Sequence, residues 1–286
     1  MITELKVQEF TRCEPLLNEN GQLEVKAVIQ GMNPGRVFVD HPLTPTTGFI
    51  WLGNNDGFIF FGNENNDKFN DGLELFFNRV IIPDATKVGV DWFEGIGNHP
   101  NWDSTIERVF QTRRLGSWKQ RVYSLHKNDF ETKVSPSISR NYEVVKITES
   151  LFENKDQSIK NSDFLHSPIL ENWSTVDLFL RHGLAYGVIS NQEIVSLCYS
   201  GFVARDVHSI GIVTLEEHRG QKLAQSAAFS YVSECLELGI TPYWDCMDSN
   251  KPSIAIAERL GFKPLFTYKG YEYPLQTGDG SHSSKS

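Results

Sequence analysis

The stretch 210–224 decides the fold, and it reads Ile-Gly-Ile-Val-Thr-Leu-Glu-Glu-His-Arg-Gly-Gln-Lys-Leu-Ala. Its first part, 210–214, is rich in β-branched residues, which predicts a strand. The acidic turn 215–218 follows, and we expect a helix to begin near Arg219. Apolar residues then recur at helical spacing, and Gly239 predicts the end of that helix.

A second strand and helix follow directly. Residues Thr241–Met247 predict the strand, 248–250 a loop, and Pro252–Leu260 a helix that ends before Gly261. Two successive β-α-β crossings imply a sheet with helices packed on it. Upstream, the pattern predicts strands at 142–147, 184–189, 193–204 and 208–214, and a helix over 174–182 with Ser174 as N-cap.

The first half of the chain has a different pattern, rich in Asn, Gly, Phe and Trp. We expect strands at 48–52, 57–61 and 120–125, and short helices at 73–80 and 104–113. The polar segment 127–141 contains Pro136 and predicts a domain boundary. We therefore expect an N-terminal α+β domain over 1–135 that helps to shape the substrate site, a second domain over 140–274, and a disordered tail over 275–286.

The turn before the long helix can bind an anion. A helix N-terminus offers unpaired amides and the positive end of its dipole, and Gly220 and Ala224 leave room for a phosphate. Arg219 and Lys222 add positive charge. An ordinary capped helix would have the same features, and the turn alone does not separate the two interpretations.

The run 219–224 resembles the acetyl-coenzyme A motif of the GNAT acetyltransferases, R/Q-x-x-G-x-G/A. Arg219 fits its first position and Ala224 its sixth, whereas Lys222 stands where the family usually has Gly. A second motif of that family, N-x-x-A/S-x-x-L-Y-x-x-x-G-F, is matched at Asn250, Ser253 and Gly261-Phe262. The two motifs occur in the expected order and on the expected elements.

This resemblance implies an α/β (α+β) fold with a GNAT-type mixed, mostly antiparallel sheet and flanking helices in the C-terminal half. The smaller α+β N-terminal domain would precede it, as in the zwittermicin-resistance-type branch, which the C-terminal half resembles most. The implied activity is transfer of an acetyl group from acetyl-coenzyme A, as co-substrate, to a primary amine of a small molecule by direct attack in a ternary complex. Two alternatives stay open: a coenzyme A-binding protein without catalysis, or an acetyltransferase that modifies a protein amine.

The resemblance also implies the site residues. The coenzyme would contact Ile212, Val213, Thr214, Arg219, Gly220, Gln221, Lys222, Leu223, Ala224, Asn250 and Ser253. The tyrosine that many members use to protonate the leaving thiolate is replaced by Ala257. Candidate catalytic residues are Asp245, our first choice as the base, with Glu216 as another acid, and Tyr271 and Tyr273 as proton donors. Tyr268 should face the other side of its strand.

Composition excludes several other classes of protein. The net charge is −9 and the pI about 5.4, which argue against nucleic acid as a partner. No apolar run is long enough for a membrane span, and no signal peptide is evident, so we expect a cytoplasmic protein. Neither the histidines nor the four cysteines have metal-ligand spacing, so no metal is expected, and the cysteines should be small core residues. Homodimer formation is left open.

Overall fold

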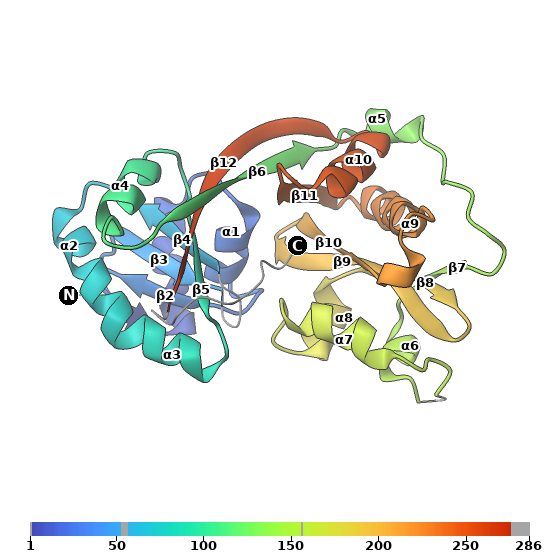
Figure 1. Ribbon diagram of the computed structural model, residues 1–286, viewed down its shortest axis with the longest axis horizontal. Helices are drawn as coiled ribbons and strands as arrows, with labels where there is room; N and C mark the ends of the chain where they lie inside the picture. Colours follow the sequence, from blue (N-terminus) through green and yellow to red (C-terminus); the bar gives the residue numbers. More distant parts are fainter. Residues whose placement is uncertain (1, 53–56, 156, 276–286) are drawn as a thin grey trace. The chain divides into compact units, whose positions relative to one another are not determined.

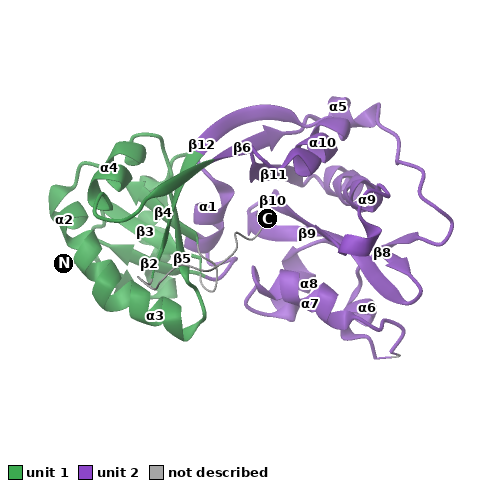
Figure 2. Cartoon of the chain, in the orientation of Figure 1, with its two compact units in different colours: residues 1–20, 35–118, 269–286 green, residues 21–34, 119–268 purple. Residues whose placement is uncertain are grey.

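The computed structural model describes residues 2–52, 57–155 and 157–275, so the expected tail lies outside the described residues except for Leu275. The chain divides into two compact units (Figure 2). Unit 1 comprises residues 1–20, 35–118 and 269–286, and unit 2 comprises 21–34 and 119–268. This division does not coincide with the predicted boundary at 127–141, and that boundary stays a prediction.

Unit 1, coloured green in Figure 2, contains six neighbouring strands of a 12-stranded sheet, together with helices. Its strand order is β1-β2-β3-β4-β5-β12, antiparallel except for the parallel pair β4–β5. The strands are β1 (Thr3–Leu5), β2 (Arg36–Val39), β3 (Thr47–Trp51), β4 (Gly57–Gly62), β5 (Trp92–Gly97) and the second half of β12 (Lys263–Pro274). The helices are η1 (Val7–Leu16), α2 (Asp67–Phe76), the π-helical η2 (Phe77–Ile81), α3 (Ile82–Lys87) and α4 (Trp102–Val109).

The core of unit 1 is aromatic. Phe93 on β5 stacks on Phe58 with ring centroids 5.2 Å apart and on Tyr273 at 4.6 Å. Phe77 and Phe110 contact the same ring at 5.5 and 4.9 Å. Alternating apolar residues on short strands produce this packing, because successive side chains point to opposite faces of a sheet.

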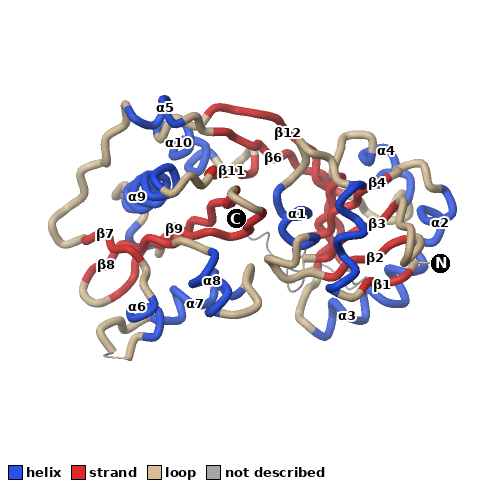
Figure 3. Tube along the Cα trace, turned by 180° about the vertical axis from the view of Figure 1, so that it is seen from behind, coloured by secondary structure: helices blue, strands red, loops and turns tan. Residues whose placement is uncertain are grey.

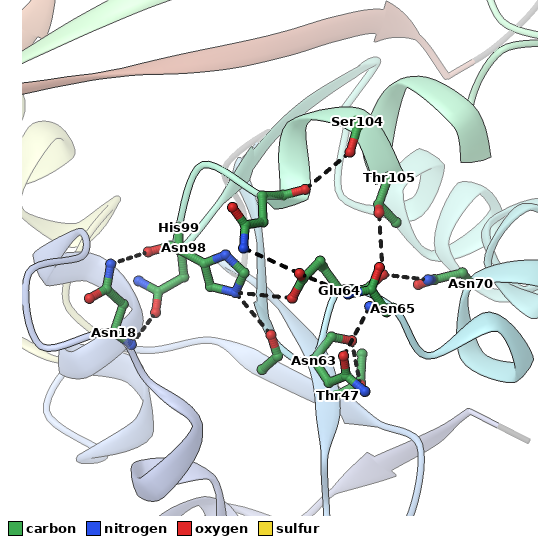
Figure 4. A network of polar contacts seen from close by, with 12 residues as sticks. Asn18, Thr47, Asn63, Glu64, Asn65, Asn70, Asn98, His99, Ser104 and Thr105 are labelled. Atoms are coloured by element: carbon green, nitrogen blue, oxygen red, sulfur yellow. Dashed lines mark hydrogen bonds and ion pairs between the residues drawn. The ribbon is translucent and has the colours of Figure 1, made fainter.

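A polar network joins the loops that follow β4 and β5 (Figure 4). His99 Nε2 lies 3.0 Å from the Gly62 carbonyl oxygen, and the Thr105 hydroxyl donates to the Glu64 carbonyl oxygen at 3.2 Å. Asn98 accepts from the Asn18 amide at 2.7 Å. These mutual contacts satisfy loop groups that would otherwise compete for water, and they indicate a structural role.

Unit 2 contains the other six strands of the sheet, and helices cover both of their faces. Its strand order is β6-β11-β10-β9-β8-β7, in which only β10–β11 is parallel. The strands are β6 (Gly116–Ser124), β7 (Glu143–Lys146), β8 (Ala185–Ser190), β9 (Glu193–Ala204), β10 (Val207–Thr214) and β11 (Thr241–Met247). The helices are α1 (Leu23–Ile29), α5 (Lys127–Glu131), α6 (Glu149–Glu153), α7 (Ser162–Leu170), α8 (Val176–His182), η3 (Glu216–His218), α9 (Leu223–Glu237) and α10 (Lys251–Arg259).

Helices α9 and α10 cover one face of this sheet, and α6, α7 and α8 cover the other, as both views show (Figures 1 and 3). The predicted fold class is therefore confirmed: a mixed, mostly antiparallel sheet with flanking helices. The strands over 193–204 and 241–247 have the predicted bounds. The four cysteines are free and buried, as expected.

The segment 21–34 belongs to unit 2 although it comes from the first half of the sequence. Helix α1 packs Leu23 and Ala27 against Phe202 and Ala204. Asn33 anchors the end of the segment, because its side chain accepts from the Val203 amide at 2.8 Å and donates to the carbonyl oxygens of Gly201 and Asn172 at 2.9 and 2.8 Å. A division of the sequence into two consecutive domains cannot predict these contacts, because they join segments that are far apart in the sequence.

Several helix starts differ from the prediction. Helix α2 begins at Asp67 rather than at Leu73, and α4 begins at Trp102 rather than at Ser104. The long helix α9 begins at Leu223 rather than near Arg219, because Gly220 and Lys222 have φ angles of +77° and +65°, outside the helical region. Helix α8 is capped by Thr175, whose side chain accepts from the Leu178 amide at 3.2 Å, rather than by Ser174. Across the described ranges, no helix is both long enough and apolar enough to cross a membrane.

Candidate active site

Strands β10 and β11 begin as a parallel pair and then separate. Residues 207–209 pair with 241–243, after which β11 pairs with β6 and β10 pairs with β9 alone. The register of β10 against β9 shifts between His208 and Ile210, which marks a β-bulge. Within the described chain, the β11-facing edge of β10 over 210–214 has no strand partner. An extended ligand can therefore pair with its backbone groups.

The predicted coenzyme residues Ile212, Val213 and Thr214 lie on this segment and are half-buried. The Thr214 hydroxyl lies 2.8 Å from the Ser196 hydroxyl on β9. Arg219, after the turn, donates from Nε to the Thr214 carbonyl oxygen at 3.4 Å. The strand end and the loop before α9 are thereby held together.

The loop 219–222 leads into α9 and is exposed. Gly220 has a positive φ, and a Cβ built there would meet no atom within 4 Å, so open space surrounds it. No side chain caps the N-terminus of α9, in which Leu223 is buried and Ala224 half-buried. Free helix amides, a nearby guanidinium and open space fit a phosphate-bearing ligand.

Asn250 and Ser253 stand at the start of α10. The Asn250 side chain caps the helix by accepting from the Ser253 amide at 3.1 Å. The Ser253 hydroxyl accepts from Trp244 Nε1 at 3.1 Å. Both side chains thus have structural partners in this structure, and their contact with the coenzyme stays a prediction.

A cavity of about 210 Å³ lies where β10 and β11 separate. Its walls come from α1, from β6, β9, β10 and β11, from the first half of β12 and from the loop after α7. The lining residues are Glu24, Gln120, Asn172, Tyr199, Gly201, Phe202, Ser209, Ile210, Gly211, Asp245 and Tyr268. All belong to unit 2. The cavity therefore adjoins the unpaired edge of β10.

Two carboxylates face this cavity. The Tyr268 hydroxyl donates to Asp245 Oδ2 at 2.6 Å, whereas Asp245 Oδ1 has no hydrogen-bond partner. Burial, and secondarily the Glu24 carboxylate, raise the pKa of Asp245 well above its ordinary value. Burial likewise raises the pKa of Glu24, whose Oε2 atom has no partner. A carboxylate whose pKa is raised binds a proton more tightly than an exposed one, which suits it to acid–base work.

Comparison with known proteins identifies the family. The GNAT acetyltransferase family matches residues 14–271. The chain belongs to this family. It is also 27% identical, over 249 residues, to the uncharacterised N-acetyltransferase YdfB of Bacillus subtilis (strain 168), covering 86% of this chain and 88% of that protein.

Solved structures of GNAT proteins share the fold. A GCN5-related N-acetyltransferase-like protein from Streptococcus suis superposes with a TM-score of 0.67 at 18% identity, covering 93% of this chain and 98% of that one. A tandem GNAT protein from the clavulanic acid biosynthesis pathway gives a TM-score of 0.60 at 11% identity, covering 98% and 100%. At these identities the similarity shows the fold alone.

In this GNAT chain the tyrosines of β12 are placed differently from the expectation. Tyr271 and Tyr273 share a face, as predicted, but that face lies in the aromatic core of unit 1. The Tyr271 hydroxyl donates to Glu107 Oε1 at 3.0 Å, and Tyr273 stacks on Phe93. Both are 1% exposed, so packing accounts for them. The hydroxyl at Asp245 is that of Tyr268, which the sequence analysis had set aside.

The other proposed acid, Glu216, lies in the exposed first turn of η3. A carboxylate at this position interacts favourably with the free backbone amides of the turn. His208 is buried, with Nδ1 2.9 Å from the Ser200 hydroxyl, and burial lowers its pKa to about 4. His208 is thus neutral at physiological pH. Of the predicted catalytic residues, Asp245 alone lines the cavity.

Three residues that line the cavity, Glu24, Gln120 and Tyr268, were not predicted as site residues. Glu24 carried one detectable signal: it stands in a run in which Leu23, Val25 and Ala27 are all buried. A carboxylate in such a run must have a partner or a function. Nothing linked it to Asp245, which lies 221 positions later in the chain.

Proposed function

We propose that this protein transfers the acetyl group of acetyl-coenzyme A to a primary amine of a small molecule, as in the zwittermicin-resistance-type branch. The amine nitrogen attacks the thioester carbonyl, the C–N bond forms and the C–S bond breaks. The bound ammonium loses two protons in all. The base takes the first and releases it to solvent, which makes the nitrogen nucleophilic, and the departing thiolate gains the second after the C–N bond has formed. The observation that carries this proposal is the separation of β10 from β11 beside a cavity that contains two acids.

The coenzyme is assigned to the open edge of β10 and to the loop 219–222. The pantetheine arm would lie along 210–214 as an added strand, with backbone hydrogen bonds on one side. The pyrophosphate would lie at the uncapped start of α9, where Arg219 and Lys222 contribute charge. A backbone amide of β10 would donate to the carbonyl oxygen as negative charge develops on it.

Asp245 is assigned as the base that takes the proton from the acceptor amine. Because its pKa is raised, Asp245 binds a proton more tightly than an exposed carboxylate does. Its proton affinity is therefore closer to that of the amine that it deprotonates. Tyr268 orients the carboxylate through the 2.6 Å hydrogen bond. Because a free thiol titrates at roughly 8.5, the departing thiolate needs little help from a general acid. Replacement of the family's tyrosine by Ala257 is therefore compatible with turnover.

The proposal is tested by following amine-dependent release of coenzyme A thiol from acetyl-coenzyme A. We expect release with small primary amines, together with an acetylated product detected by mass spectrometry. Binding of acetyl-coenzyme A without amine-dependent release would identify a non-catalytic coenzyme-binding protein. Release with peptides but not with free amines would identify a protein acetyltransferase. A cytoplasmic location stays a prediction.

The coenzyme placement is tested separately with Gly220→Val. The side chain meets open space in the free protein but would occupy the region assigned to the pyrophosphate. We expect calorimetry to show at least tenfold weaker binding of acetyl-coenzyme A, with the circular dichroism spectrum retained. The matched control is Gly239→Val, which has a similar φ of +74° and open space at the other end of α9. Equal affinity in the two variants would overturn this placement.

A further inference from the structure

The cavity in unit 2 has a surplus of hydrogen-bond acceptors. Oxygens of three neighbouring side chains, Glu24 Oε2, Asp245 Oδ1 and Gln120 Oε1, are buried and have no hydrogen-bond partner. All three residues line the cavity. Because an unsatisfied buried acceptor costs about 1–3 kcal/mol, this arrangement is expected only where a ligand or water supplies donors.

The charge of the cavity narrows the class of ligand. Two carboxylates face it, and among its lining residues, all of which are described, there is no Lys, Arg or His. A ligand that brings N–H donors and a positive charge satisfies the orphaned oxygens and relieves repulsion between the acids. A primary ammonium has three N–H donors, and it can contact all three acceptors at once.

The side chains around the acids limit the size and chemistry of the rest of the ligand. Tyr199, Phe202 and Ile210 provide apolar surface, and a volume of about 210 Å³ is below the range usual for drug-sized ligands. Position 211 has room for glycine alone, since a Cβ there would lie 2.5 Å from the Tyr199 ring. A carboxylate on the ligand would meet Glu24 and Asp245 with no cation to neutralise it.

We propose, on the basis of the function above, that Glu24 and Asp245 together bind the ammonium group of the acceptor and restrict acceptors to small primary amines without a carboxylate beside the amine. Asp245 takes the first proton that the ammonium loses. Glu24 positions the nitrogen and keeps the site selective for cations. Amino acids are therefore excluded, whereas the amines that correspond to them without the carboxylate are accepted.

Pairs of ligands with and without a carboxylate test the proposed exclusion of amino acids, and they require no protein variant. Acetyl transfer is measured for tyramine against tyrosine and for 2-phenylethylamine against phenylalanine, with each amino-acid amide as a third member. The amide has nearly the size of the amino acid but no negative charge. We expect kcat/KM to fall at least 100-fold from amine to amino acid, and to recover at least tenfold in the amide. Equal values for amine and amino acid would overturn the proposal, as would an amide as poor as the acid.

Glu24→Gln tests the positioning residue, because glutamine keeps the shape and removes the charge. We expect KM for the amine to rise about tenfold or more, with kcat reduced much less, since Glu24 binds the acceptor but does not take the proton. The control is Glu258→Gln, an exposed glutamate on α10 of the same unit, for which both constants should be unchanged. An unchanged KM in Glu24→Gln would remove Glu24 from the acceptor site.

Failure of this inference can be separated from failure of the proposed function. Calorimetric titration of the coenzyme A-loaded protein with 1,5-diaminopentane requires no catalysis. We expect binding that Glu24→Gln weakens and Glu258→Gln does not, while affinity for acetyl-coenzyme A is the same in all three proteins. Amine-dependent turnover without this weakening would overturn the role of Glu24 and leave the acetyltransferase assignment in place. Amine binding that Glu24→Gln weakens, without turnover in the wild-type protein, would overturn the proposed acetyl transfer and leave the ammonium site in place.

Discussion

Strand β12 runs through both units, and its tyrosines have different environments in each. In unit 2, the Tyr268 hydroxyl contacts a carboxylate at the edge of a cavity. In unit 1, Tyr271 and Tyr273 pack in an aromatic core. The same residue type, within six positions of one strand, therefore serves a polar site in one unit and packing in the other. The strand pattern cannot distinguish these roles, because alternation fixes the face and not its surroundings.

The two units also differ in where their unpartnered buried polar atoms lie. In unit 1 such atoms, for example Asn70 Oδ1, Trp102 Nε1 and the Tyr273 hydroxyl, belong to three separate elements, α2, α4 and β12. In unit 2, three acceptors remain without partners around one cavity, next to two acids with raised pKa values. Unsatisfied groups lower stability and are retained where a ligand uses them. We infer that unit 1 is built for packing, and that unit 2 gives up stability at its cavity.

The largest expected effect is in the core of unit 1. Phe93→Ala removes a ring that is 0% exposed and contacts Phe58, Phe77, Phe110 and Tyr273. We expect a loss of about 3–5 kcal/mol in the free energy of unfolding, because burial and a cavity both contribute. Denaturant titration measures it. A loss below about 1 kcal/mol would contradict the view of unit 1 as a unit stabilised by aromatic packing.

The next effect compares the tyrosines of β12 directly. Tyr268→Phe removes the hydrogen bond to Asp245, and hydrogen bonds to charged groups contribute about 1.5–3 kcal/mol. We therefore expect kcat/KM for acetyl transfer to fall about 10- to 100-fold, with an altered pH profile because Asp245 loses its donor. Tyr271→Phe and Tyr273→Phe serve as matched controls and should change kcat/KM less than threefold. A larger loss in either control than in Tyr268→Phe would restore the sequence-based assignment.

The sequence predicted local features well and long-range ones poorly. The strands 193–204 and 241–247 and the end of α9 before Gly239 depend on nearby residues, and the structure confirms them. The partnership of Glu24 with Asp245 and the anchor at Asn33 depend on contacts between distant segments. Without an alignment, the printed sequence contains no signal that pairs such residues.

The third prediction concerns the stability given up at the cavity. Because the folded-state pKa of Asp245 is raised, the folded chain holds a proton that the unfolded chain has released, so wild-type stability falls as pH rises from about 4 through that pKa. Asp245→Asn removes this loss. We expect the variant to be more stable by about 1 kcal/mol above that pKa, with no difference near pH 4, while acetyl transfer is largely abolished.

Thermal unfolding at pH 4 and pH 8 measures this effect, with Asp248→Asn as its control. Asp248 lies just beyond β11 and pairs with Arg121, which lowers its pKa. Its loss should leave stability at pH 8 unchanged or slightly reduced. If the Asp245→Asn protein were less stable than the wild type at pH 8, the inference that the Asp245 carboxylate lowers the stability of the folded chain would be wrong.

The smallest expected effect concerns backbone strain in the loop 219–222 of unit 2, where the coenzyme is proposed to bind. Lys222 has a φ of +65°, at the position where the GNAT motif usually has Gly. A left-handed conformation costs a non-glycine residue roughly 1–2 kcal/mol, and glycine recovers part of this while losing more entropy on folding. We expect Lys222→Gly to stabilise the protein by about 0.5 kcal/mol, and Lys222→Ala, which keeps the Cβ, to show no gain.

Comparison of the same two variants separates the backbone of this loop from its charge. Both remove the lysine ammonium, so any equal loss of acetyl-coenzyme A affinity in calorimetry measures its interaction with the phosphates, expected to be less than tenfold at an exposed position. A difference in affinity between the two would show that the backbone conformation matters for binding. If alanine stabilised the protein as much as glycine, the lysine side chain rather than its φ angle would be the source of strain. The lysine in the family's glycine position would then have to be explained by its side chain alone.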